Sequence, residues 1–328
     1  MIAGMRSIRI VALLAILVTT ASWSHGETIT VATYNIENFY QRFPTTQPVD
    51  RELAAHIRAM CDKMNWITSQ VILDPKFNPD VLVLEECCDQ DQLDKFNKTW
   101  LKSAYETVIV FPSNSERHQS LAIMLKPGFK IVDRKDQYYL EKDPGGGNER
   151  GDKLFARGPA FCLVQTPGGY KFWVGVTHQK SKSGNNAEIT AWRNREAKRT
   201  HQIIKELEAQ GPSDVMLLGD MNDELGVQEY ELEAGGDVIT NLVGPPDDGL
   251  ILATKPLIDA GQISYGGYWR TDHRSFIDQV VITKSVKDEL REVNVFTDGL
   301  ARASSDHYPI YVKLQTTPTS APATQPAR

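Results

Sequence analysis

The feature of this sequence that most constrains its fold is a short apolar run that ends abruptly in polar residues. Residues 215–218, Val-Met-Leu-Leu, have the composition of a buried strand. The turn Gly219-Asp220-Met221-Asn222 follows at once. Asp and Asn are common turn residues, but here they also place a carboxylate and an amide at the end of a buried strand. Whether they form a site depends on how the other strands end.

Polar side chains also end or interrupt the other predicted apolar strands. They are Asn35 with Glu37, Glu85 with Glu86, His178, Asp278, and Asp306 with His307. In the strand predicted over residues 28–36, the alternation of side chains puts Asn35 and Glu37 on one face. The repetition of this pattern favours a functional site over simple turn chemistry at Asp220 and Asn222.

The order of predicted elements favours two packed sheets. Strands are predicted at residues 28–36, 80–84, 107–110, 121–125, 130–133, 155–165, 170–177, 215–219, 276–283, 293–296 and 308–314, and helices at 51–73, 90–101 and 188–210. Hairpins outnumber strand–helix–strand units, so the sheets should be mostly antiparallel. Helices flanking two such sheets give an α+β fold, a four-layer α/β/β/α sandwich. The apolar residues of helix 51–73, its Met and Trp positions included, are expected in the core.

The two ends of the chain differ from the middle. Arg6 and Arg9 precede a short apolar run over residues 10–18 and then small residues, the pattern of a secretory signal rather than of a membrane anchor. We therefore expect a signal peptide over 1–26, one domain over 27–315, and a disordered, proline-rich tail over 316–328. The mature protein should be secreted or periplasmic, without a stable membrane anchor, and a monomer.

Four cysteines in 328 residues do not make a disulfide scaffold, even in an exported protein. Adjacent cysteines seldom bond to each other. The pairing to test is Cys61 with either Cys87 or Cys88, which would leave Cys162 reduced.

Basic residues cluster in the sequence near His178 and Asp278, although the formal net charge is −6. They are Arg150, Lys153, Arg157, Lys180, Lys182, Arg193, Arg195, Lys198, Arg199, Arg270 and Arg274. They could form a basic rim for a polyanion. For the helix at 188–208, ion pairs with acidic residues of the same stretch are an equal alternative.

Seven of these motifs, taken in order, resemble the endonuclease/exonuclease/phosphatase superfamily, whose members have the deoxyribonuclease-I-like fold. The matching segments are Tyr34-Asn35-Ile36-Glu37-Asn38, Leu84-Glu85-Glu86, Arg157-Gly158-Pro159, Thr177-His178-Gln179-Lys180-Ser181, Gly219-Asp220-Met221-Asn222, Ile277-Asp278-Gln279-Val280 and Ser305-Asp306-His307-Tyr308-Pro309. The resemblance extends from about residue 28 to 314, and the first segment is similar to secreted bacterial members.

The resemblance implies metal-dependent hydrolysis of phosphoesters and a role for each site residue. Glu86 would bind Mg²⁺ or Mn²⁺, with Glu37 and Asp306 beside the ion. Asp220 would be the general base, with Asn35 and Asn222 orienting water and phosphate. His307, held by Asp278, and His178 would donate to the phosphoryl oxygens, and Arg157 and Lys180 would bind substrate. Glu85 is expected to point away from the site.

The substrate is left open at this level. An exported nuclease that acts on nucleic acid is the first interpretation. Relatives with the same core that cleave sphingomyelin or inositol phosphates provide an alternative, for which Tyr265, Tyr268 and Trp269 could form a small apolar surface. A third possibility is a binding protein that has lost catalysis, but every acid, base and metal position is filled.

Overall fold

The computed structural model describes residues 26–42, 50–147, 151–182, 187–226, 229–266 and 274–316. The predicted signal peptide, up to residue 25, and the predicted tail, from residue 317 on, lie outside the described residues. None of the helices in the described part is both long enough and apolar enough to cross a membrane.

Two six-stranded sheets form the body of the molecule. The first has the order β11 (Leu290–Val295), β12 (Ile310–Gln315), β1 (Thr28–Asn35), β2 (Val81–Cys87), β4 (Ser120–Leu125) and β3 (Thr107–Phe111). The second has the order β5 (Lys130–Lys135), β6 (Ala160–Gln165), β7 (Lys171–His178), β8 (Val215–Asp220), β10 (Asp278–Thr283) and β9 (Leu250–Leu252). Among these strands only the pairs β1/β2 and β7/β8 are parallel. The predicted sandwich of mostly antiparallel sheets is confirmed.

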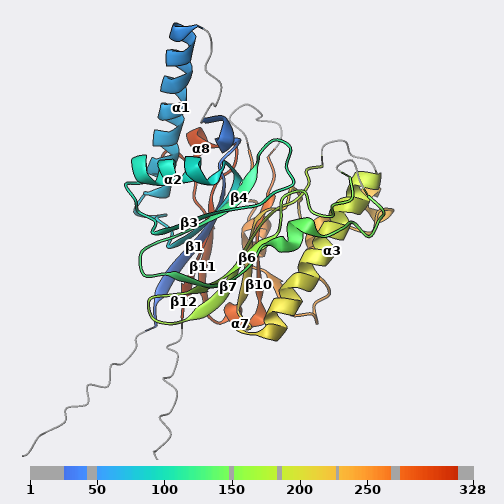
Figure 1. Cartoon of the computed structure of the whole chain (residues 1–328). Coiled ribbons are helices and arrows are strands. Elements are labelled where there is room, and N and C mark those ends of the chain that lie inside the picture. Colours follow the sequence, from blue (N-terminus) through green and yellow to red (C-terminus); the bar gives the residue numbers. More distant parts are fainter. Residues whose placement is uncertain are drawn as a thin grey trace, which may run out of the picture.

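Helices cover the outer faces of both sheets (Figure 1). The helices α1 (Arg51–Ile72) and α2 (Gln90–Thr99) lie on the first sheet, and α3 (Ala187–Gln210) lies on the second. Between the sheets, Val31, Val83, Val174 and Leu218 are fully or almost fully buried in one apolar cluster. Burial of each such side chain stabilises the folded state by roughly 1.5–3 kcal/mol. This rigid core fixes the strand ends that carry the polar groups.

Shorter elements connect the layers. They are η1 (Phe39–Arg42), η2 (Gln137–Leu140), α4 (Glu229–Leu232), α5 (Val238–Val243), α6 (Lys255–Asp259), α7 (Lys284–Lys287) and α8 (Ala301–Ser304). The sequence predicts a loop-rich region over residues 235–267, but α5, β9 and α6 lie there. Their apolar stretches are only a few residues long, too short to show a helical or strand period.

Part of α1 differs from the prediction that its apolar residues lie in the core. Leu53, Met60 and Trp66 are 50%, 56% and 48% exposed. Figure 1 shows the reason, since the N-terminal part of α1 projects beyond the sheet that its C-terminal part covers. Only the second half, with Ile67 and Val71, is packed against the body.

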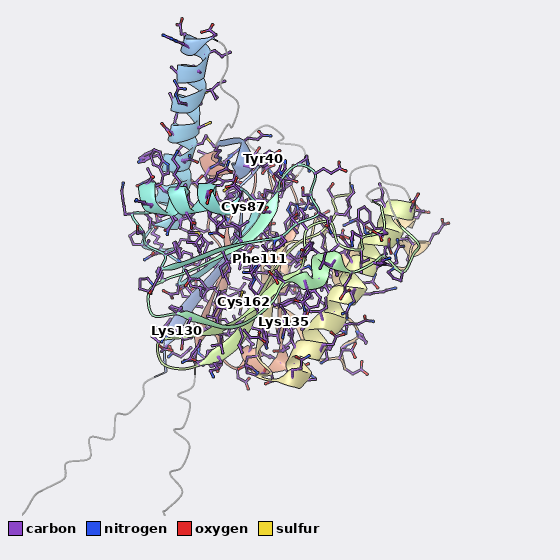
Figure 2. The ribbon with its side chains drawn as sticks, viewed as in Figure 1. Tyr40, Cys87, Phe111, Lys130, Lys135 and Cys162 are labelled. Carbon is purple, nitrogen blue, oxygen red and sulfur yellow. The ribbon has the colours of Figure 1, made fainter. Side chains whose placement is uncertain are left out.

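The predicted disulfide between Cys61 and Cys87 or Cys88 is absent from the structure, in which all four cysteines are free thiols. Cys87 and Cys88 are buried with their sulfur atoms 3.9 Å apart, whereas the Cys61 thiol lies near the carbonyl of Gln41. Figure 2 shows Cys87 and Cys162 on strands of different sheets. Cys61 lies on α1 and Cys87 on β2, and placing two elements in one layer does not bring two sulfur atoms to bonding distance.

Candidate functional site

The ends of five strands bring the predicted polar residues to one place. The parallel pairs align Asn35 with Glu85 on β1 and β2, and His178 with Asp220 on β7 and β8. A hydrogen bond of 3.0 Å from Asn35 Nδ2 to Asp220 Oδ2 joins the two sheets. Asp278 enters from the start of β10, directly opposite Asp220. The site therefore spans the edge of both sheets.

A glycine makes the approach of His178 and Asp220 possible. Gly219 has a φ of 142°, and a Cβ atom there would lie 2.0 Å from the carbonyl oxygen of Thr177. Any larger residue would push β7 and β8 apart. The Gly-Asp sequence at the end of β8 is therefore a packing requirement of the site itself.

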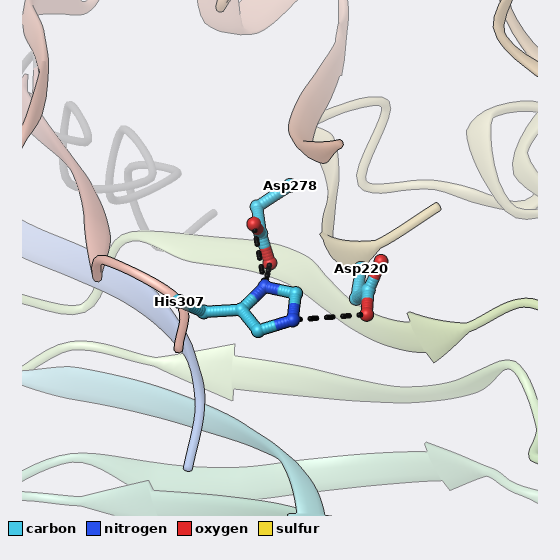
Figure 3. A group of neighbouring side chains, drawn as sticks. All are labelled: Asp220, Asp278 and His307. Carbon is cyan, nitrogen blue, oxygen red and sulfur yellow. Dashed lines mark hydrogen bonds and ion pairs between the residues drawn. The ribbon is translucent and has the colours of Figure 1, made fainter. Parts of the chain in front are cut away.

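His307 is buried and held by Asp278 (Figure 3). Its Nδ1 lies 2.9 Å and 3.1 Å from the two carboxylate oxygens of Asp278. Burial alone lowers the pKa of His307, but the carboxylates of Asp278 and Asp220 raise it well above the usual range. The imidazole is therefore a cation at neutral pH, with Nε2 directed toward Asp220 at 3.8 Å.

Asp220 is the most densely contacted carboxylate of the site. Its Oδ1 accepts from the backbone N–H of Asn222 at 2.7 Å, and its Oδ2 lies 3.3 Å from His178 Nε2. Burial raises the pKa of Asp220 to about 7, although the positive charge of His307 opposes this. A carboxylate with this pKa accepts a proton readily near neutral pH.

Two groups of side chains are candidates for holding a cation. Ligand atoms of Asp220, Asp278 and His307 lie within 4.8 Å of one another. In that group the Asp278 carboxylate already accepts a hydrogen bond from His307 Nδ1, which favours a role in proton transfer over metal binding. The second group, Glu37, Glu86 and Asp306, offers carboxylate oxygens alone, the ligands that a hard divalent ion prefers.

Among the described residues only Asp220, Asp278 and His307 have ligand atoms clustered in this way, so the second group is supported by its charges and backbone conformation. Burial raises the pKa of Glu37 and of Asp306, and the negative charges of the group raise both further. Such mutual repulsion is relieved by a bound cation. Glu37, Asn38 and Glu86 also have left-handed backbones, with φ of 45°, 46° and 55°. Non-glycine residues adopt this conformation at a cost, which is common at functional sites. The Asn38 N–H fixes Glu86 Oε2 at 2.8 Å.

Arg157 is buried and holds the backbone of the His178 segment, whereas contact with substrate was expected. It is 3% exposed and donates to the carbonyls of His178 and Gln179 at 3.2 Å and 2.9 Å. A third bond, to Gln119 Oε1, is 3.0 Å long. Lys180 is also buried, and its backbone N–H donates to Glu196 Oε2 of α3 at 3.2 Å. The substrate-binding role of Lys180 stays a prediction.

Four residues of the predicted basic rim are used in ion pairs inside the protein. The carboxylate of Asp223 is paired with both Lys182 and Arg193. Arg195 is paired with Asp143 at 2.6 Å, and Arg199 with Glu141 and Glu206. These cations are therefore paired as the alternative expected, but only the Arg199–Glu206 pair lies within the 188–208 stretch, and the other partners come from distant segments. Arg150 and Arg270 lie outside the described residues, as do Tyr268 and Trp269.

The structure also gives three further residues a place beside the site, and it corrects the expectation that Glu85 points away from it, because Glu85 interacts with the charges of Asp278, Asp220 and His307. Glu85 is buried between the sheets, where it accepts from Thr33 Oγ1 at 2.5 Å, and burial raises its pKa well above the usual range. Ser305 links two strand ends, since its hydroxyl donates to the Asn35 carbonyl and accepts from the His307 N–H. The Tyr265 ring lies 4.9 Å from the His307 ring. Glu85 and Ser305 lie inside motifs that the sequence showed, whereas nothing in the sequence placed Tyr265 beside His307.

Comparison with known proteins agrees with this architecture. A family model described as the Endonuclease/Exonuclease/phosphatase family matches residues 32–307. Truncated TDP2 from Caenorhabditis elegans is 18% identical with a TM-score of 0.58, over 88% of this chain and 98% of that one. A mannosyl-6-phosphatase from Bacteroides thetaiotaomicron is 18% identical with a TM-score of 0.57, over 87% and 99%. TDP2 from D. rerio, complexed with a single-strand DNA product, is 17% identical with a TM-score of 0.54, over 88% and 99%. These likenesses show the fold. Among curated protein sequences, none matches the chain.

Proposed function

This chain belongs to the endonuclease/exonuclease/phosphatase family, and we propose that it is an exported nuclease that uses Mg²⁺ to hydrolyse phosphodiester bonds of nucleic acid. Membership of the family makes the chain a metal-dependent phosphoesterase. The nucleic-acid substrate, the identity of the ion and the export of the protein are the proposed part.

The observation that carries this function is the position of the buried imidazole of His307 between the carboxylates of Asp278 and Asp220. Asp278 holds Nδ1, so Nε2 is the nitrogen that faces the reacting groups. We assign the removal of a proton from the attacking water to Asp220, because its pKa of about 7 lets it accept a proton at neutral pH. Asn35 Nδ2 holds the carboxylate in place for this step.

Charge that builds on the phosphoryl oxygens needs donors already in position. His307 is suited to this role because its two aspartate neighbours keep it protonated. His178, fixed by the bonds from Arg157 to its own carbonyl and to that of Gln179, provides a second imidazole next to Asp220. Asn222 donates its side-chain amide to the Gln179 carbonyl at 3.0 Å and so fixes the same segment.

Glu86, with Glu37 and Asp306, would hold the divalent ion. When bound, the ion supplies Lewis-acid stabilisation of the phosphate. Three carboxylates and no nitrogen or sulfur ligand suit Mg²⁺, which prefers oxygen and retains several waters.

Export is proposed from the basic leader and short apolar run at residues 6–18. The nucleic-acid substrate is supported by the place of the site where strand ends of both sheets meet, with Glu37, Glu86 and Asn222 only partly buried. A fold relative in complex with a DNA product is a further point in its favour. A second candidate, a phospholipid phosphodiesterase, is favoured by the exposed Leu53, Met60 and Trp66 of α1.

A substrate panel tests the proposal. Single-stranded DNA, duplex DNA, RNA, sphingomyelin vesicles and bis-p-nitrophenyl phosphate are each incubated with Mg²⁺, with Mn²⁺ and with chelator. We expect nucleic acid to be turned over faster than sphingomyelin, and all turnover to stop in chelator. Faster cleavage of sphingomyelin at low salt would replace the nuclease with the second candidate.

A further inference from the structure

A pocket of about 590 Å³ lies beside the candidate metal site, between η1, α1 and α8. Glu37 and Ser305 belong both to the wall of this pocket and to the site. A substrate whose phosphate lies at Glu86 and His307 would therefore extend into the pocket with the group next to that phosphate. None of the site residues predicted from the sequence, apart from Glu37, lines it.

The pocket presents two cations that have no ion pair within the described part of the chain. Lys63 of α1 and Arg302 of α8 are both exposed and line the pocket. They contrast with Lys182 and Arg193, whose charges are used by the buried carboxylate of Asp223. An anion that enters the pocket would thus meet two cations that form no ion pair with a carboxylate of the described residues, with Glu37 on the side of the pocket that faces the metal site.

Arg42 also lines the pocket but is not available in the same way. It is buried and donates to the carbonyls of Ile36 and Ser304 at 2.8 Å and 3.0 Å. A third bond goes to Thr68 Oγ1 at 2.7 Å. Its role is to hold η1 against α1 and α8, which shapes the pocket wall.

The same pocket has an apolar side. Met60, Met64 and Ile67 line it at helical spacing on α1, and Met60 is 56% exposed. The exposed Met60 offers apolar surface that a bound ring can cover. Thioether side chains adapt to flat aromatic rings and contact them favourably. The pocket therefore combines an apolar wall for a ring with two cations for an anion.

We propose that this pocket is a subsite for the nucleotide next to the scissile phosphate. Its base would lie against Met60 and Met64, and its own phosphate would meet Lys63 and Arg302. This proposal rests on the nuclease function proposed above. A nucleic acid alternates flat rings with phosphates and so matches both halves of the pocket. A phospholipid with a single phosphate would place that phosphate at the catalytic site and leave the two cations opposite its acyl chains.

The test compares two double variants of equal charge. The first is Lys63→Ala with Arg302→Ala. The second, a matched control, is Lys130→Ala with Lys171→Ala. Both control lysines are exposed and lie on β5 and β7, at the strand ends away from His178. Figure 2 shows Lys130 at the end of the molecule away from Tyr40 of η1. Binding of a fluorescent single-stranded oligonucleotide is measured by anisotropy in chelator, and cleavage is measured in Mg²⁺.

We expect the first variant to weaken oligonucleotide binding by about 10- to 100-fold at low salt, because two phosphate contacts are lost. The slope of log K against log salt should become shallower by about 1.4, the value for two contacts on a single strand. The ratio of kcat/KM on the oligonucleotide to kcat/KM on bis-p-nitrophenyl phosphate should fall in proportion. The control variant should change neither.

The apolar half is tested by Met60→Ala with Met64→Ala, on an oligonucleotide with or without one abasic position beside the cleaved bond. If the base lies on these methionines, removing the base and removing the methionines should cost less together than the sum of the separate losses. Additive losses would overturn the placement of the base.

The outcomes separate this proposal from the nuclease function. Cleavage of the oligonucleotide with unchanged binding in the Lys63/Arg302 variant would overturn the subsite and leave the nuclease. Hydrolysis of bis-p-nitrophenyl phosphate, without binding or cleavage of any oligonucleotide by the wild type, would overturn both. Binding to sphingomyelin–phosphatidylcholine vesicles that is lost in the Met60/Met64 variant, without oligonucleotide binding, would assign the pocket to lipid.

Discussion

Asp220 and Asp278 lie directly opposite each other on the antiparallel strands β8 and β10, and both are buried. Two like charges at such a position destabilise a sheet unless a cation compensates them. His307 provides that cation, because Asp278 bonds its Nδ1 and Asp220 lies 3.8 Å from its Nε2. The protonation states of the three groups are therefore interdependent, which allows predictions about the pH dependence of activity.

The acidic limb of the pH–rate profile should report the ionisation of Asp220. Its pKa of about 7 exceeds the ordinary aspartate value, so Asp220 is protonated below that pH and cannot accept a proton. The kcat/KM for bis-p-nitrophenyl phosphate in Mg²⁺ should therefore rise with pH through about 7. Asp220→Asn should lower the rate by about 10²–10⁴-fold and remove this limb. A wild-type rate already at its plateau at pH 5 would contradict the assignment.

The alkaline limb should depend on Asp278. Its carboxylate helps to raise the pKa of His307, so loss of that charge lowers the pKa. In Asp278→Asn, the fall in activity that marks deprotonation of His307 should move to lower pH. The exposed Asp259→Asn on α6 is the matched control and should leave the profile unchanged. An alkaline limb at the same pH in both variants would show that another group controls it.

Loss of the Glu86 charge should weaken metal dependence specifically. In Glu86→Gln, size is retained but one of three carboxylates that favour the ion is lost, so turnover should fall by about 10²-fold or more at low Mg²⁺. Part of the activity should return at high Mg²⁺. Glu233→Gln, a change of an exposed glutamate after α4, should have no effect. A loss that Mg²⁺ does not reduce at any concentration would argue against metal binding by Glu86.

The sequence predicted the location of those site residues whose position depends on the order and pairing of the strands. Asp220 ends β8 and Asp278 begins β10, so the pairing of those strands places them opposite each other, and His307 lies in the short loop just before β12. The same reasoning predicted the layers, because hairpins and helical spacing are local patterns. It also located Asn35 and His178, which lie on the last residue of β1 and of β7.

The sequence was uninformative where contacts join distant segments. Lys182 and Arg193 meet Asp223 only because α3 packs beside β8, so their charges could not be recognised as paired. Amphipathic spacing in α1 shows which face is apolar, but not whether another element covers it, as the exposed Met60 demonstrates. Glu85 and Glu86 are adjacent in sequence, and the spacing alone did not show that Glu85 is buried between the sheets whereas Glu86, with its left-handed backbone, is only partly buried.

These ion pairs lead to a last prediction, in which Lys182 acts on stability and not on nucleic-acid binding. Lys182 bridges the buried carboxylates of Asp223 and Glu231, so Lys182→Ala leaves two buried charges with one partner fewer. Breaking buried pairs costs about 3–5 kcal/mol, and partial exposure of Lys182 reduces this to about 1–3 kcal/mol. The melting temperature should fall by about 2–4 °C for each kcal/mol. Lys198→Ala, at an exposed position of α3, should leave it unchanged. The salt dependence of nucleic-acid cleavage should be that of the wild type in both variants. A flatter salt slope with an unaltered melting curve in Lys182→Ala would return this lysine to the substrate-binding surface.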